Sequence, residues 1–130
     1  MSAINHPQIA TFEASAAITK GKAVKLTASQ GGKKVTQCSG TTDDAIGIAQ
    51  NDAANAGDLV EVALAGGGGK ALAKATIAAG NRLGINADGS IQKVASQGDT
   101  EFAVAMDDAV AGDIFPVMIK AQTKAYAAQA

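Results

Sequence analysis

The sequence predicts an all-β protein, a small β-barrel or sandwich built from two copies of an internal repeat and preceded by an extended N-terminal arm. Two observations carry this prediction. Short segments of alternating apolar and polar residues are separated by turn signals, a pattern typical of small barrels and sandwiches. The same order of segments also occurs twice, in residues 10–64 and in residues 69–119. At 130 residues the chain has the length of one compact domain, so we expect the copies to share a core.

The repeat is clearest in the second part of each copy, where residues 45–64 match residues 101–119 if one residue is deleted. Each run has a short apolar segment, a loop rich in Asp and Ala that ends in Ala-Gly-Asp, and a segment whose alternate residues are apolar. Upstream, residues 18–26 correspond to residues 77–85. A duplicated unit fixes the architecture of a chain, so we expect one small unit used twice.

About four short strands are expected in each copy, beginning with an opening strand near residues 11–14 or 70–73. A hairpin follows. In the first copy its turn signal is residues 30–33, and in the second copy it is residues 86–90, where Asp-Gly supplies the positive φ angles of a tight turn. Alanine favours helices, but the spacing of the glycines leaves no room for an uninterrupted helical stripe and the two copies agree better on strands, so we predict strands there as well.

Three segments lie outside the two copies. Residues 1–9 form a polar arm, residues 120–130 form a tail rich in Ala and Gln, and four glycines at residues 66–69 join the copies. Glycine runs behave as flexible connections, so we expect a flexible joint within a single β domain that spans residues 10–119.

Composition excludes several classes of protein. The chain has 11 basic and 12 acidic residues, which leaves no basic field for nucleic acid. Cys38 is the single cysteine, so neither an internal disulfide nor a multi-cysteine metal site can form. No apolar segment approaches the roughly 18 residues of a membrane span, and the start lacks a secretion signal. We expect no nucleic acid, membrane or cofactor, and synthesis in a cytoplasm.

The core should be thin, because much of the apolar content is alanine and only four aromatic residues are present. Large apolar side chains contribute about 1.5–3 kcal/mol each on burial, and alanine offers far less area. Binding to a partner stabilises a folded protein by mass action, so a thin core favours a function in an assembly.

The most prominent polar positions are the Gly-Asp pairs that recur in register, Gly57-Asp58 and Gly112-Asp113. Glycine adopts backbone conformations closed to other residues, and an Asp carboxylate accepts N–H groups of its own turn. We interpret both pairs as structural turns.

Two other classes of function stay open as alternatives. In a small oligomeric hydrolase, Asp58, Asp113 and Asp108 would meet at a subunit interface, but the chain has no nucleophile elbow, and a pair of His6 with Cys38 would require the arm to fold back. A carbohydrate-binding β module would need aromatic platforms, which are almost absent. We therefore expect no enzymatic activity and no catalytic residues.

Three motifs stand in order at residues 17–26, 45–49 and 56–64: Ala-Ile-Thr-Lys-Gly-Lys-Ala-Val-Lys-Leu, Ala-Ile-Gly-Ile-Ala and Ala-Gly-Asp-Leu-Val-Glu-Val-Ala-Leu. In these motifs, and in the weaker second copy, the chain resembles the tailed-phage capsid cement, or head-decoration, family over residues 12–119. The resemblance implies a β-rich protein of the virion that binds the capsid exterior, commonly as a homotrimer, and clamps neighbouring subunits of the major capsid protein. It implies no catalytic residues.

The arm and the start of the first strand are the predicted contact region for a partner. An extended arm or a sheet edge can add backbone hydrogen bonds to a neighbouring subunit, and apolar side chains along it add contact area. The predicted contact residues are Ile4, His6, Pro7, Ile9 and Phe12.

Overall fold

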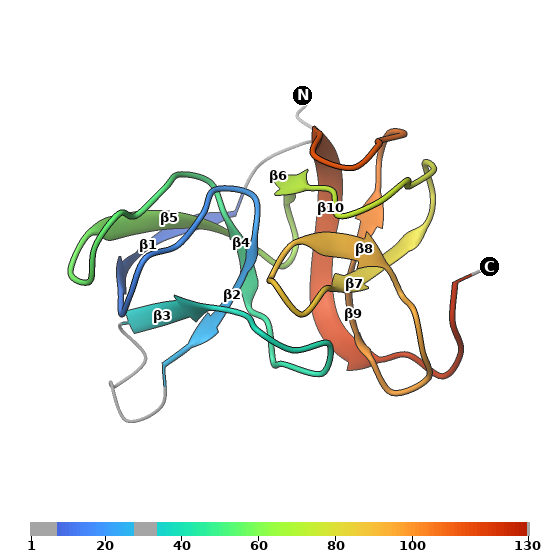
Figure 1. Cartoon of the computed structure of the whole chain (residues 1–130), viewed down its shortest axis with the longest axis horizontal. Helices are drawn as coiled ribbons and strands as arrows, with labels where there is room; N and C mark the ends of the chain where they lie inside the picture. Colours follow the sequence, from blue (N-terminus) through green and yellow to red (C-terminus); the bar gives the residue numbers. More distant parts are fainter. Residues whose placement is uncertain (1–7, 28–33, 130) are drawn as a thin grey trace.

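The computed structural model describes residues 8–27 and 34–129, which form ten β-strands and no helix (Figure 1). The prediction of an all-β fold is confirmed. Within this part of the chain, no helix exists that could cross a membrane. Most of the arm and the turn at residues 30–33 lie outside the described residues.

The first half of the chain is a closed five-stranded barrel with the strand order β1-β3-β2-β4-β5. The barrel closes because β1 pairs on one side with β5 in antiparallel fashion and on the other with β3 in parallel fashion, where Glu13 lies opposite Lys34. Its strands are β1 (Ile9–Ala14), β2 (Ala23–Leu26), β3 (Lys34–Gln37), β4 (Gly47–Ala49) and β5 (Leu59–Leu64).

Small and branched side chains fill the barrel, as strict alternation along its strands predicts. In β5, Val60 and Val62 are fully buried, while Leu59 before them and Glu61 between them face outward. The buried cluster is Ala14, Ile18, Val24, Val35, Ala49, Ala53, Val60 and Val62, with Phe12, Ile46 and Leu64 packed against it.

The second half is a five-stranded sheet with the order β6-β10-β9-β7-β8. A single parallel bridge between Ala73 and Ile91 stands where the first half has the β1–β3 pairing. Each half thus has five strands where the sequence predicts about four. The strands are β6 (Gly68–Leu72), β7 (Arg82–Ile85), β8 (Ile91–Lys93), β9 (Thr100–Ala105) and β10 (Ile114–Lys124).

The last strand is longer than the sequence predicts. β10 continues five residues beyond Ile119, so residues 120–124 belong to the sheet rather than to a separate tail. After a register shift, Thr123 and Lys124 pair with Glu101 and Thr100 of β9. The segment that follows the sheet begins at Ala125.

Corresponding positions make equivalent backbone contacts within each half. Ile18 bridges Ala53 in the first half, and Ile77 bridges Ala109 in the second. The nitrogen of Gly57 donates to the oxygen of Ala14 in β1 at 2.8 Å. The corresponding nitrogen of Gly112 donates to the oxygen of Ala73, just after β6, also at 2.8 Å. These contacts are equivalent in geometry, while the origin of the halves by duplication stays a prediction.

The halves lie side by side and are joined by backbone hydrogen bonds and a common cluster (Figure 1). Leu72 nitrogen donates to Gly21 oxygen, and Ala23 nitrogen donates to Gly89 oxygen, both at 2.8 Å. The first half contributes Ala23, Cys38, Ala45, Ile48 and Ala63 to the shared cluster, and the second half contributes Ala71, Ala73, Ile77, Leu83, Ile85, Ile91, Phe102, Ala103, Ala105, Ala109, Phe115, Val117 and Ile119.

The prediction of a flexible joint at the glycine run is wrong. Gly66 nitrogen donates to Ile119 oxygen and Ile119 nitrogen donates to Gly67 oxygen, each at 2.9 Å. Gly69 lies within β6, where an added Cβ would stand 2.9 Å from the Cβ of Ala63. Glycine is needed here because β5 and β6 approach closely, which composition alone does not distinguish from flexibility.

Candidate interaction surfaces

The structure separates the two predicted contact residues that it describes. Ile9, the first residue of β1, is 46% exposed. Phe12, three residues later, is half-buried and packs against the cluster inside the barrel. Ile4, His6 and Pro7 lie outside the described residues, so their contact role stays a prediction.

Ile9 borders an apolar groove of about 280 Å³ at the junction of the halves. Met106, which is exposed, and Pro116 also line it, so the groove can hold one apolar side chain. Its lining is Ile9, Gln50, Gly68, Gly69, Lys70, Met106, Pro116 and Val117. It lies where the predicted arm enters the barrel.

Gln50 closes the outer edge of β6 beside this groove. Its Oε1 accepts a hydrogen bond from Lys70 nitrogen at 3.1 Å, and its Nε2 donates to Lys70 oxygen at 3.2 Å. The amide therefore replaces a neighbouring strand at this position, which protects an edge that could otherwise pair with another chain.

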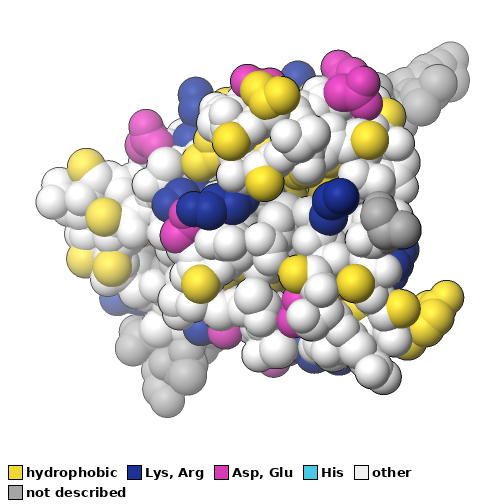
Figure 2. Space-filling view, turned by 45° about the vertical axis from the view of Figure 1, so that its right-hand side comes forward, with side chains coloured by type: hydrophobic (Ala, Val, Ile, Leu, Met, Phe, Trp, Pro, Cys, Tyr) yellow, Lys and Arg dark blue, Asp and Glu magenta, His cyan; other side chains and the backbone are white. Residues whose placement is uncertain are grey.

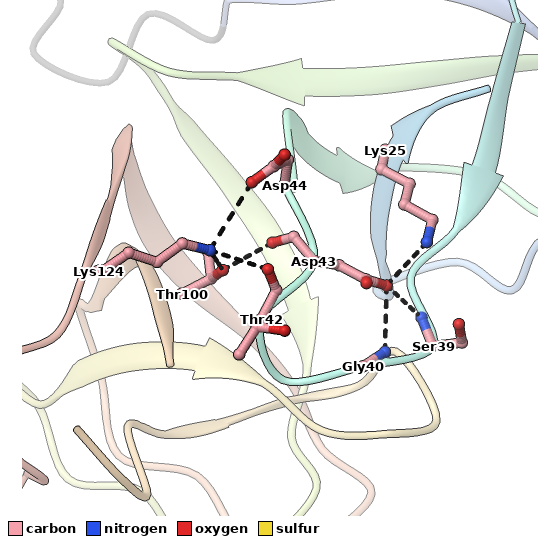
Figure 3. Close-up of polar contacts among 8 residues, drawn as sticks. All are labelled: Lys25, Ser39, Gly40, Thr42, Asp43, Asp44, Thr100 and Lys124. Carbon is pink, nitrogen blue, oxygen red and sulfur yellow. Dashed lines mark hydrogen bonds and ion pairs between the residues drawn. The ribbon is translucent and has the colours of Figure 1, made fainter. Parts of the chain in front are cut away.

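A polar clamp ties the loop before β4 to β9 and β10 (Figure 3). Thr100, fully buried, donates its hydroxyl to Asp43 oxygen at 2.6 Å. Lys124 Nζ donates to Thr42 oxygen and to Thr100 Oγ1, both at 2.8 Å, and lies 3.7 Å from Asp44.

The carboxylate of Asp43 organises the loop within this clamp (Figure 3). Its Oδ2 accepts the nitrogens of Ser39 and Gly40 at 2.8 and 3.1 Å, and Lys25 Nζ lies 3.1 Å away. Partial burial alone would raise the pKa of Asp43, but the hydrogen bonds and the ammonium group together lower it. The side chain therefore stays ionised and holds the loop at neutral pH.

A wider groove, about 490 Å³, runs between this clamp and the end of β10. β6 pairs with residues 114–118 of β10. Within the described part of the chain, residues 120–122 of β10 have no strand partner on that side. The groove is more polar than the one at Ile9, and its lining is Lys25, Leu26, Thr42, Asp43, Asp44, Ile46 and Gln122.

Glu101 forms a second charged cluster on the second half. Its side chain is 9% exposed and lies between Arg82, 3.0 Å away, and Lys120. Burial opposes its ionisation, but the hydrogen bonds from Lys120 and Arg82 outweigh that effect and lower the pKa. On the face shown in Figure 2, basic and acidic side chains are interspersed, so this face carries no field of one sign.

The recurring Gly-Asp pairs occupy corresponding turns. Gly57 and Gly112 have φ angles of 94° and 90°, in the region that favours glycine. Asp58 Oδ2 accepts two backbone nitrogens of its own turn at 3.0 and 3.1 Å, and Asp113 Oδ2 accepts one at 3.0 Å. Asp108 accepts the nitrogen of Ala79 at 2.8 Å. These carboxylates hold loop backbone in place.

Among the described residues, the groups considered for catalysis do not form a recognisable active site. Burial, followed by the charge of Asp43, raises the pKa of the Cys38 thiol to about 12, so the reactive thiolate is scarce at neutral pH. His6 lies outside the described residues. Among the described residues, no group of three or more His, Cys, Asp or Glu side chains could hold a metal ion.

The aromatic side chains do not form a platform for a sugar ring. Phe102 and Phe115 are buried, and Phe12 packs against the barrel interior. Tyr126 is 85% exposed and stands alone after β10. The carbohydrate alternative therefore gains no support from these four residues.

Sequence reasoning missed the groove that Met106, Gln50 and Pro116 form with Ile9. One signal was present. Proline cannot donate to a strand ladder, so a proline inside an expected strand marks an edge or an irregular position. Pro116 lies opposite Lys70 of the edge strand β6, and its oxygen accepts the nitrogen of Met106 at 3.0 Å.

No protein-family model and no curated protein matches this chain. Among solved structures, the chain is similar to the head fiber gp8.5 N base of bacteriophage phi29, with a TM-score of 0.68 and 16% sequence identity. The similarity covers 88% of this chain and 95% of that chain. The chain therefore shares its fold, over nearly its whole length, with the base of a phage head fiber.

Proposed function

We propose that this protein is a structural component of a tailed-phage head, a cement protein that binds the outer surface of the assembled shell and clamps neighbouring major capsid subunits. The observation that carries the proposal is the shared fold with the phi29 head-fiber base, which covers nearly all of both chains. The order of motifs in the first copy supports it independently of that fold.

The chemistry of the surface is consistent with a role in contact rather than in catalysis. The carboxylates of the recurring turns already accept backbone N–H groups, and the single thiol is buried. The net charge of −1 provides no long-range attraction to a charged polymer. Modest contacts of this kind become strong when many copies bind one lattice.

The groove at Ile9 is the proposed place where the arm region meets the shell. Ile9, Met106 and Pro116 form an apolar site that an apolar side chain of a capsid subunit can fill, while the arm pairs with the same subunit. Self-association as a homotrimer would bring three such sites around one axis, and we include it in the proposal.

The experiment measures binding to emptied heads of the same phage by co-sedimentation. The test variant lacks residues 1–7 and keeps Gln8, whose oxygen accepts Leu64 nitrogen at 2.6 Å. We expect the variant to melt at the temperature of the full chain and to require at least about tenfold more protein for half occupancy, the loss of roughly 1.4 kcal/mol of binding. Full occupancy by this variant at the concentration of the full chain would refute the role of the arm.

A matched pair of substitutions tests the groove. Ile9→Ser places a polar group beside Met106 and should weaken binding to the heads, whereas Val110→Ser changes a more exposed apolar residue on the loop between β9 and β10. Equal binding of the two variants would remove the groove from the proposal. Absence of binding by the unaltered protein, with folding intact, would remove the capsid function itself.

A further inference from the structure

The first half presents a face that the second half covers. Gly21 has a φ of 90° and donates its nitrogen to Ala49 oxygen, and two residues later Ala23 donates to Gly89 oxygen of the second half at 2.8 Å. Gly89 also lies tightly against the neighbouring strand, since an added Cβ would stand 2.8 Å from Cys38 oxygen. The hairpin turn of the second half therefore docks between Ala23 and Cys38.

The second half has the same face at corresponding positions. Gly80 has a φ of 88° and donates to Ala105 oxygen, and Arg82 follows it as Ala23 follows Gly21. Val94 nitrogen donates to Arg82 oxygen, just as Cys38 nitrogen donates to Ala23 oxygen. Arg82 and Val94 are thus the equivalents of the two residues that hold the turn in the first half.

The end of the chain occupies this second face. Arg82 nitrogen donates to Gln129 Oε1 at 2.7 Å, and Arg82 Nη2 donates to Ala127 oxygen at 3.2 Å. Gln129 nitrogen donates to Val94 oxygen at 2.9 Å. Residues 125–129, the C-terminal strap, therefore satisfy on the second half the positions that the docked turn satisfies on the first.

The strap is held lightly. Ala125 is its one fully buried side chain, and Tyr126 is 85% exposed. Burial of a methyl group contributes far less than burial of a large apolar side chain. A partner that buries large apolar side chains against Arg82 and Val94 can therefore displace the strap.

The first half carries two such side chains on its surface. In the second half, the matching residues border the junction. Ile85 is 1% exposed in the shared cluster, and Ile114 is 45% exposed, with its Cδ1 3.1 Å from the position of a Cβ at Gly21. Their equivalents in the first half, Leu26 and Leu59, are 45% and 67% exposed. Each first-half residue is thus more exposed than its equivalent at the junction.

We propose that the face at Arg82 and Val94 binds the Leu26–Leu59 end of a second copy of this chain, and that the C-terminal strap competes with that contact. The contact joins unlike faces, so it repeats head to tail and builds rings or open chains rather than two-fold dimers. The strap then acts as the cap that terminal units of repeat proteins require. This inference does not rest on binding to a phage head.

The experiment compares the full chain with a variant that lacks residues 126–130 and keeps Ala125, by sedimentation velocity over a range of concentrations. Removal of a competing segment increases the fraction of molecules in which the face is open, and the apparent affinity rises in proportion. We therefore expect half-association at a concentration at least about tenfold lower. Addition of a peptide with the sequence of residues 125–130 should reverse the effect. An unchanged mass distribution for a folded truncated variant would overturn the proposal.

Substitutions in the truncated variant identify the occupant. Leu26→Lys combined with Leu59→Lys should restore the behaviour of the full chain, while Val110→Lys, at a residue 57% exposed on another loop, should not. Association that persists with both leucines replaced would overturn the proposed occupant. If the truncated variant does not fold, the full chain with Gln129→Leu, which removes the acceptor of Arg82 nitrogen, decides. We expect half-association at roughly threefold lower concentration, and no change would overturn the proposal.

Discussion

The two halves use one order of strands but close differently. In the first half, Glu13 and Ala14 of β1 pair with Lys34 and Val35 of β3, which completes a barrel. In the second half, Leu72 nitrogen instead donates to Gly21 of the neighbouring half, and one bridge remains of the corresponding pairing. A strand pattern therefore does not decide whether a small sheet closes. The neighbour that its first strand meets decides it.

The halves also differ in what fills them. The barrel cluster consists of small and branched residues, with Ile46 only partly buried against it. At the corresponding position the second half has Phe102, which is 1% exposed in the cluster that reaches into the first half. The second half thus depends on its neighbour for its core, while the first encloses a core of its own.

The largest expected effect breaks this difference in packing. Phe102→Ala should lower the free energy of unfolding by about 3–5 kcal/mol, the range for buried phenylalanine. Ile46→Ala, at the matching position, should cost roughly 1–2 kcal/mol because its side chain is partly exposed. Urea unfolding at neutral pH measures both. Equal losses would show that the two clusters contribute alike.

The second prediction concerns two matched glycines. Gly21 and Gly80 have φ angles of 90° and 88°, but a Cβ at Gly21 would stand 2.8 Å from Leu72 nitrogen, whereas at Gly80 nothing lies within 4 Å. Both Ala variants should lose about 1–2 kcal/mol from backbone strain. Gly21→Ala should lose about 1–3 kcal/mol more from the clash at the junction. The measurement is the difference in the free energy of unfolding between the two variants. Equal values would contradict the close contact at the junction.

A third prediction uses Cys38 as a probe of the junction. The thiol is buried in the shared cluster and its pKa is raised to about 12, so it should react slowly with a thiol reagent at pH 8 in the native protein. Loosening the junction exposes it. We expect faster labelling in Gly21→Ala than in Gly80→Ala, with labelling rates followed by mass spectrometry. The reverse order would place the weakest point of the fold elsewhere.

The smallest expected effect is a dependence on acid. Partial burial opposes ionisation of Asp88, but hydrogen bonds from Ser90 and the nearby Lys74 lower its pKa from 3.8 to about 2. A lowered pKa stabilises the folded state above pH 3.8, and this contribution is lost as the pH falls from 3.8 towards 2. Asp88 is 44% exposed, so the contribution should be below about 1 kcal/mol.

Asp88→Asn tests this contribution. The variant should be slightly less stable than the unaltered protein at pH 6, and the difference should shrink between pH 4 and pH 2, as measured by urea unfolding at each pH. A difference that is constant with pH would assign the effect of the substitution to lost hydrogen bonds rather than to charge.

The sequence predicts strands and turns within each half, but it does not predict how the first half closes or how the two halves contact each other. Alternation in residues 59–64 and the Asp-Gly signal at residues 88–89 predict a strand and a hairpin, and both are present. The closure of β1 on β3 and the contact of Leu72 with Gly21 depend on which strand meets which neighbour. No local pattern encodes that choice, because strand preference depends on the neighbours against which a strand packs.

Among the residues that line the apolar groove, only Ile9 was predicted from the sequence as a contact residue. Phe12 and Ile9 both look like apolar residues near an arm, and only the register of β1, with Phe12 opposite Val60 and facing the barrel interior, distinguishes them. Gln50 replaces a strand through a side-chain amide, for which a sequence carries no signal. The contact roles of Ile4, His6 and Pro7 stay predictions.

Close approaches of the backbone form part of the junction between the halves, and this has a consequence for recombination. Gly21, Gly69 and Gly89 each stand where a side chain would collide with the other half. Exchanging one half for that of a distant relative should therefore give a folded chimaera only if the three glycines and the side chains of the shared cluster are retained. Lineages of such proteins can then vary the outer surface of each half separately.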